Sequence, residues 1–191
     1  YGAASPQEYA YWARRACGVV CIKMAVDALT GTPSGSVMDW VHAGLALNGY
    51  LVELRPERQD QPVEKGWKHS TLADLARARG LDAALVSRLS VSDLPELIRR
   101  DCLLIASVSS ELGEAERPIT RLSGHLVVVL GVELDERGAA SAVIVHNPSG
   151  RTPAMQAHAH IDAERFAQGF SGRGVLVSAP ETQSTGTALQ R

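Results

Sequence analysis

The sequence of 191 residues is poor in the features that define several classes of protein. It has only three cysteines, and its formal net charge is −2. So few cysteines exclude a disulfide framework. A near-neutral charge without a Lys/Arg run argues against nucleic acid or an anionic membrane as a partner. The longest apolar stretch, Leu126–Val132, is far shorter than the roughly 20 residues that span a bilayer. We therefore expect no membrane segment.

Hydrophobic residues make up 45% of the chain and charged residues 21%, the balance of a folded globular protein. The first residues, YGAASPQEY, lack the charged and apolar regions of a targeting signal. Together with the sparse cysteines this favours the cytoplasm, or secretion if a signal has been removed. The last residues lack apolar periodicity. We expect one domain over residues 1–180 and a flexible tail over 181–191.

The apolar pattern changes from helical to strand-like along the chain. It predicts helices over 17–29, 36–47, 72–79, 93–100 and 162–168 and strands over 83–86, 103–108, 126–134, 142–146, 153–161 and 174–178. Residues 51–69 are polar, contain two prolines, and are expected to be irregular. Early helices followed by a mostly antiparallel sheet indicate an α+β fold with a helical N-terminal lobe and a β-sheet C-terminal lobe.

Cys17 stands at the start of the first predicted helix. The free N–H groups and partial positive charge of a helix N-terminus stabilise a thiolate, so Cys17 is a candidate nucleophile. Gly18 would allow a substrate backbone to approach closely. The alternative is a buried structural thiol, which is the commoner fate of a cysteine.

His125 opens the predicted strand GHLVVVLGV, and Asn147 follows the strand that ends in VIVH. If these strands form a hairpin centred near Glu136–Arg137, paired positions sum to about 273, which places His125 opposite Asn147 or Pro148. The amide oxygen of Asn147 could then orient the imidazole as a general base. The alternatives are a solvent-facing histidine and an ordinary Asn-Pro turn.

A metal site is a second interpretation of the same region. Cys17 and Cys21 are one helical turn apart, and His158 and His160 share one face of a predicted strand. Four such ligands could hold a zinc ion in tetrahedral geometry. Neither pair has a recognised zinc spacing, so we predict no metal and no other cofactor.

Two segments resemble the bacterial cysteine peptidases that remove double-glycine leaders from bacteriocins, and their stand-alone relatives. ACGVVCIKMAVDALTG (16–31) is similar to their active-site helix, which has Cys-Gly at its start and Gly at its end. GHLVVVLGVELDERGAASAVIVHNPSG (124–150) is similar to their His strand and the Asp/Asn-Pro strand that follows. Residues 66–81 and 172–177 extend the resemblance to most of 9–178. It implies a papain-like two-lobed fold.

The resemblance implies Cys17 as nucleophile, His125 as base and Asn147 as the orienting residue. The leader peptidases carry a glutamine six positions before the cysteine to help hold the oxyanion, and Tyr11 stands there in this sequence. Gln7 would need a different loop path to replace it. Tyr11, together with Gly18 and Gly124, is a candidate oxyanion or substrate-binding residue.

The implied activity is that of a cysteine peptidase that cleaves a peptide or amide bond through a thioester acyl-enzyme. The same triad serves acyl or peptidyl transfer when an amine or thiol resolves the thioester. A third alternative is a catalytically inactive peptide-binding module of the same fold, which the missing upstream glutamine favours. All three predict a peptide or peptide-like partner, and the sequence does not indicate an oligomeric state.

Overall fold

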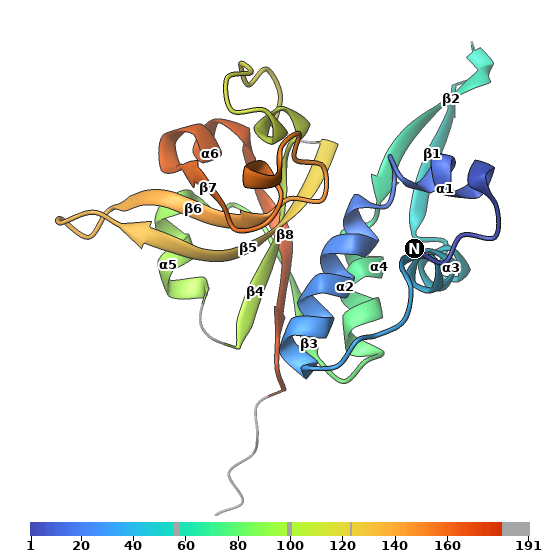
Figure 1. Ribbon diagram of the computed structural model, residues 1–191, viewed down its shortest axis with the longest axis horizontal. Helices are drawn as coiled ribbons and strands as arrows, with labels where there is room; N and C mark the ends of the chain where they lie inside the picture. The colour runs from blue at the N-terminus through green and yellow to red at the C-terminus, as the bar shows by residue number, and fades with distance from the viewer. Residues whose placement is uncertain (56–57, 99–100, 123, 181–191) are drawn as a thin grey trace, which may run out of the picture.

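The computed structural model describes residues 1–55, 58–98, 101–122 and 124–180. It forms two lobes that meet along helix α2 (Figure 1). The N-terminal lobe contains α1 (Pro6–Trp12), α2 (Cys17–Thr30), α3 (Val37–Ala46), the hairpin of β1 (Tyr50–Arg55) and β2 (Arg58–Trp67), and α4 (His69–Arg77). The C-terminal lobe contains β3 (Asp82–Val86), η1 (Val91–Asp93), α5 (Leu94–Leu97), β4 (Cys102–Ser109), η2 (Ser110–Gly113), β5 (Gly124–Leu134), β6 (Ala140–His146), η3 (Pro153–Met155), β7 (Ala159–Asp162), α6 (Ala163–Gly169) and β8 (Phe170–Ser178).

The six strands of the C-terminal lobe form one sheet in the order β3-β8-β4-β5-β6-β7, and every neighbouring pair is antiparallel. β5 is buried on both faces. Leu126 and Val128 pack into the core shared with α2 and α4, whereas Val127 and Val129 pack into the core under α5 and α6. The predicted α+β class with an antiparallel sheet is confirmed.

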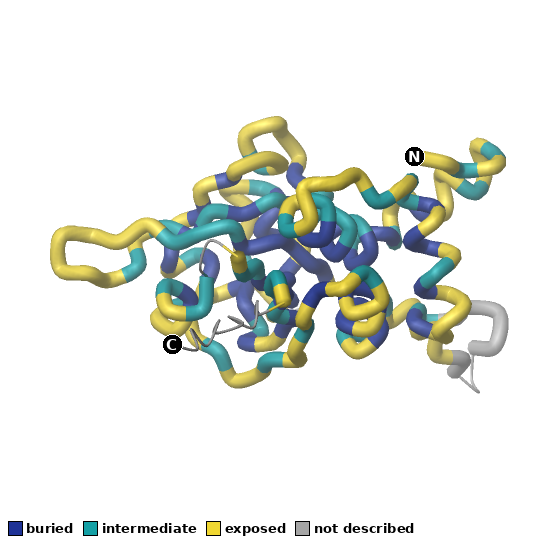
Figure 2. The backbone as a smooth tube through the Cα atoms, turned by 90° about the horizontal axis from the view of Figure 1, so that it is seen from below, coloured by how far each residue is buried: buried dark blue, intermediate teal, exposed yellow. Residues whose placement is uncertain are grey.

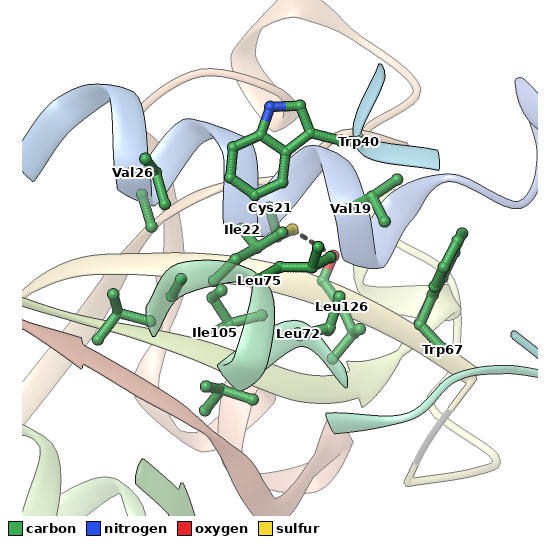
Figure 3. Packing of buried hydrophobic residues seen from close by; sticks show 14 of the residues in the cluster. Val19, Cys21, Ile22, Val26, Trp40, Trp67, Leu72, Leu75, Ile105 and Leu126 are labelled. Atoms are coloured by element: carbon green, nitrogen blue, oxygen red, sulfur yellow. Dashed lines mark hydrogen bonds between the residues drawn. The ribbon is translucent and has the colours of Figure 1, made fainter. Parts of the chain in front are cut away.

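Helix α2 places the candidate nucleophile against the sheet. Its buried face, which includes Val19, Ile22 and Val26, packs against β5 and α4 (Figure 3). Gly31 ends α2 in the left-handed conformation at φ 67°, which glycine adopts without strain. Ser36 then begins α3 with a capping box to Asp39. These two stop and start signals were visible in the sequence.

Several predicted elements need correction. Residues 51–69 were expected to be irregular, but those that the structure describes form strands β1 and β2 and the start of α4; positions 56–57 lie outside the described residues. The expected strand over 153–161 is a 3₁₀ turn followed by the short strand β7, which runs to Asp162, because Pro153 starts the turn. The helix expected over 93–100 ends at Leu97, where Ile98 is already extended, and positions 99–100 lie outside the described residues. Helix α1 was not predicted. The expected tail over 181–191 also lies outside the described residues.

The buried residues form two hydrophobic cores, one on each face of the six-stranded sheet. Buried segments are concentrated inside the molecule, and the tip of the β5–β6 hairpin is exposed (Figure 2). Each helix in the described part of the chain is too short or too polar to cross a lipid bilayer.

Candidate active site

The segment before Cys17 is held by an aromatic side chain. The indole Nε1 of Trp67 donates a hydrogen bond to the carbonyl oxygen of Arg15 at 2.8 Å. Gly18 in α2 and Gly44 in α3 make room for this indole, because a Cβ at Gly18 would lie 3.0 Å from it and one at Gly44 would overlap it. The packing of Trp67 therefore fixes how the chain enters α2 at Cys17.

Cys17 is the first residue of α2, and its N-cap residue, Ala16, has no side chain to cap the helix. The N–H groups of the first turn are therefore free to face the sulfur. Hydrogen bonding from the backbone of Leu126, Gly18 and Cys17 itself lowers the pKa of the thiol, but burial has the larger effect and raises the pKa. The contact with Leu126 ties the sulfur to the residue that follows His125.

His125 is buried in β5, and its Nε2 lies 2.8 Å from the Oδ1 of Asn147. The same oxygen accepts a hydrogen bond from the backbone N–H of Ser149 at 3.0 Å. Oδ1 is thus an acceptor in both contacts, so Nε2 of His125 carries the proton and Nδ1 is left with a free lone pair. Burial lowers the pKa of His125, and the hydrogen bond to Asn147 partly offsets this effect.

The predicted hairpin register is wrong, although the two side chains do meet. β6 pairs Val145 with Val129 and His146 with Val128, and a bulge follows Val129. Paired positions at this end of the hairpin sum to 274 rather than about 273, and the pairing of β5 with β6 ends at Val128 and His146, before it reaches His125. Asn147 is held separately, because its N–H donates to the carbonyl oxygen of Gln156 at 2.7 Å. Its side chain then reaches His125 across the end of the hairpin.

Cys17 and His125 line one cleft of about 550 Å³ between the lobes, a size usual for a ligand site. Gly124 and Leu126 border it beside His125, and Trp67 forms part of its wall on the other lobe. Sequence reasoning missed several lining residues, namely Ser107, His69, Arg121 and Arg173. Ser107 lies inside the apolar run of β4, where only the fold reveals that it faces a cleft. Burial and the nearby Arg173 lower the pKa of His69.

The structure places two of the candidate oxyanion or substrate-binding residues away from the cleft lining. Tyr11 is 43% exposed, and its hydroxyl lies 3.4 Å from Glu64. Gly18 is buried against Trp67, so its small size serves packing. Gln7 is exposed on α1. Among the described residues that line the cleft there is no glutamine or asparagine. Backbone N–H groups at the start of α2 remain as candidate oxyanion donors.

The residues of the hypothetical zinc site are engaged elsewhere. Cys21 is fully buried, and its thiol donates to the carbonyl oxygen of Leu126 at 3.2 Å (Figure 3). His158 packs edge-on against His146, and His160 lies 3.1 Å from Glu133. Within the described ranges, no three His, Cys, Asp or Glu side chains are grouped so that they could hold a metal ion.

No protein-family model matches the sequence, and no curated protein matches it. Solved structures do match. The peptidase domain of Streptococcus ComA, a bi-functional ABC transporter of a quorum-sensing pathway, is 14% identical, with a TM-score of 0.55 over 87% of this chain and 93% of that domain. A double-glycine motif protease from an AMS/PCAT transporter, solved with a leader peptide, is 15% identical, with a TM-score of 0.53 over 86% and 84%. The chain therefore has the papain-like fold of these peptidase domains, as the sequence predicted.

Proposed function

We propose that this protein is a cysteine peptidase in which Cys17 is the nucleophile, His125 the general base and Asn147 the residue that orients His125. The observation that carries the proposal is that Cys17 and His125 line one cleft while the Nε2 of His125 is bound to Asn147. This leaves Nδ1 of His125 as the atom that can take the thiol proton. The peptidase domains that share the fold, one of them solved with a leader peptide, support a peptide substrate.

The reaction follows from these atoms. Nδ1 of His125 accepts the proton of the Cys17 thiol as Sγ attacks the carbonyl carbon of the substrate. The tetrahedral oxyanion is stabilised by N–H groups at the start of α2. His125 returns the proton to the leaving amine, the C–N bond breaks, and a thioester remains on Cys17. Water, deprotonated by His125, then hydrolyses the thioester and frees the enzyme.

Burial shapes the resting state of this pair. It raises the pKa of Cys17 and lowers that of His125, so burial favours the uncharged thiol and imidazole. Proton transfer between them is therefore tied to the approach of the electrophile, and removing His125 leaves a thiol that ionises poorly near neutral pH.

Alkylation of each cysteine by iodoacetamide, read by peptide mass spectrometry, tests the assignment. Near neutral pH we expect Cys17 to be alkylated faster than the other two cysteines. His125→Ala should slow the alkylation of Cys17 about 100-fold or more, the usual range for loss of a positioned base. A library of synthetic peptides tests turnover, with Cys17→Ala as the inactive control. Equal Cys17 rates in wild type and His125→Ala, with no peptide cleaved, would reject the proposal.

Two other functions share this site, and one of them has a specific observation in its favour. The absence of a glutamine or asparagine side chain among the described cleft residues favours a peptide-binding module without turnover. Peptides retained by the wild type but never cleaved would support that function. A transferase would instead form amide products when an added amine competes with water for the thioester.

A further inference from the structure

A second cleft, of about 740 Å³, is lined by four arginines. They are Arg14, Arg117, Arg121 and Arg151. This concentration of positive charge is not a consequence of composition, because the whole chain has a formal net charge of −2. It therefore marks one specific region of the surface.

Three of the arginines in this cleft are close in sequence to the candidate catalytic residues. Arg14 lies three residues before Cys17, and Arg121 lies four residues before His125. Arg151 follows Asn147 by four residues. Arg121 lines both clefts. The two clefts therefore adjoin at Arg121.

Acidic neighbours neutralise only part of this charge. Glu114 lies 2.9 Å from Arg117 and 3.4 Å from Arg151, and Glu111 lies 3.9 Å from Arg121. Arg14 is exposed and forms no ion pair with any residue that the structure describes. Four guanidinium groups against two carboxylates leave two positive charges in surplus, so the cleft favours an anionic ligand.

Hydrogen bonds from Arg165 hold the loop that carries Arg117 and Arg121. A guanidinium nitrogen of Arg165, on α6, donates to the carbonyl oxygens of Glu114 at 2.6 Å and Arg117 at 2.9 Å. The backbone N–H of Arg151 donates to the carbonyl oxygen of Gly113 at 3.0 Å, which ties the third segment to the same loop. The backbone at Arg117 and Arg151 is thus held in place, as a binding site requires.

We propose that the arginine cleft is a substrate subsite that binds an acidic segment of the peptide cleaved at Cys17. The proposal rests on the proposed peptidase function and names its substrate class. Guanidinium groups bind carboxylates through paired hydrogen bonds, which a lysine cannot form. The described lining of the cleft contains no aromatic side chain, so it lacks the stacking surface that single-stranded nucleic acid uses.

Binding is tested without turnover in the Cys17→Ala protein. The probe is a fluorescein-labelled peptide of six glutamates, followed by fluorescence anisotropy, with the matched peptide of six glutamines as control. We expect only the glutamate peptide to bind, and the combined change of Arg14→Gln and Arg151→Gln to weaken it about tenfold or more. Replacing the same two residues with lysine should restore part of the affinity. Arg137→Gln, at the exposed tip of the β5–β6 hairpin, should have no effect.

Three results would overturn the subsite. The first is equal binding of the glutamine peptide, and the second is unchanged affinity in the Arg14/Arg151 variant when its melting temperature matches that of Cys17→Ala. The third is displacement of the probe by inorganic phosphate where sodium chloride of equal ionic strength has no effect, since this indicates a small-anion site.

Cleavage of the peptide library by the wild type separates this inference from the proposed function. If no peptide is cleaved but the glutamate peptide still binds through the arginines, the peptidase proposal fails and the anionic cleft stands. If peptides are cleaved without any enrichment of Asp or Glu near the cleaved bond, the peptidase proposal stands and the acidic subsite fails.

Discussion

The amide oxygen of Asn147 accepts hydrogen bonds from both His125 and Ser149, at 2.8 and 3.0 Å. The backbone donor fixes which end of the amide faces the imidazole. Among the described residues the other end, Nδ2, has no hydrogen-bond partner although it is buried. The side-chain amide of Asn147 is therefore held through its oxygen alone, and this makes the replacement of Asn147 by aspartate informative.

Asn147→Asp should preserve the contact with His125 and raise the pKa of the imidazole. The second carboxylate oxygen takes the place of an amide nitrogen that has no acceptor, so no hydrogen bond within the described structure is lost. The negative charge stabilises the imidazolium, whereas burial in the parent protein holds the pKa of His125 below 6.5. NMR titration of His125 in a Cys17→Ala background measures both values free of coupling to the thiol.

Asn147→Ala removes the hydrogen bond between Asn147 and His125 and is the matched control variant. It frees the imidazole to rotate, so the alkylation of Cys17 should slow while the protein stays folded. An unchanged pKa of His125 in Asn147→Asp, or Cys17 reactivity in Asn147→Ala equal to that of the parent, would contradict the orienting role.

Gly44→Ala should destabilise the protein by displacing Trp67. An alanine is better than glycine in a helix by about 1 kcal/mol, but here its Cβ would overlap the outer ring of the indole. Overpacking of this kind costs about 1–3 kcal/mol, so we expect a net loss in the free energy of unfolding. Urea denaturation measures it.

A double-mutant cycle identifies the cause of that loss. The side chain in Trp67→Leu lacks the ring atoms that Gly44 faces, so adding Gly44→Ala to Trp67→Leu should be much less harmful than adding it to the wild type. The same cost in both backgrounds would show that the glycine is needed for another reason.

The sequence allowed prediction of the elements that have a buried face. The unbroken apolar run in β5 reflects burial of the strand on both faces, and the stop and start signals at Gly31 and Ser36 reflect local backbone constraints. The β1–β2 hairpin was missed because a two-stranded sheet has no second layer to impose alternation, and Pro56, Pro62 and Gly66 were interpreted as signs of a loop. Helix α1 was missed because Trp12 alone is buried on it.

The part of the candidate site that could be predicted from the sequence is the set of residues marked by their type and by their position at the end of a helix or strand. Cys17, His125 and Asn147 were named from a helix start and two strand ends, even though the register between the strands was wrong. The wall formed by Trp67 and the arginine cleft depend on which distant segments the fold brings together. No local pattern could show that the four arginines, spread from position 14 to position 151, share one surface.

Cys21 should react with iodoacetamide far more slowly than Cys17. It is fully buried, and burial holds its pKa well above the ordinary value. Its alkylation then requires local or global unfolding, so the rate should rise steeply with urea while that of Cys17 changes little below the unfolding transition. Both rates come from one peptide-mass experiment, in which Cys17 is the internal control. Comparable rates for the two thiols in native buffer would contradict the packing of α2 against β5.

Glu111 should make the stability of the loop before His125 dependent on acid. Its carboxylate accepts hydrogen bonds from the backbone N–H and the hydroxyl of Thr120, at 2.7 and 2.6 Å, and these bonds lower its pKa from 4.5 to about 2. Because the folded pKa is the lower one, the stabilisation is complete above 4.5 and is lost as the pH falls toward about 2.

The difference in Tm between the wild type and Glu111→Gln should accordingly be largest near neutral pH and shrink as the pH falls through that range. Glu116→Gln, an exposed change in the same loop, should leave Tm unchanged throughout and serves as the control. A Tm difference for Glu111→Gln that stays constant down to the lowest pH would mean that the hydrogen bonds from Thr120 do not depend on the carboxylate charge. The loop that carries Arg117 and Arg121 would then be held chiefly by Arg165.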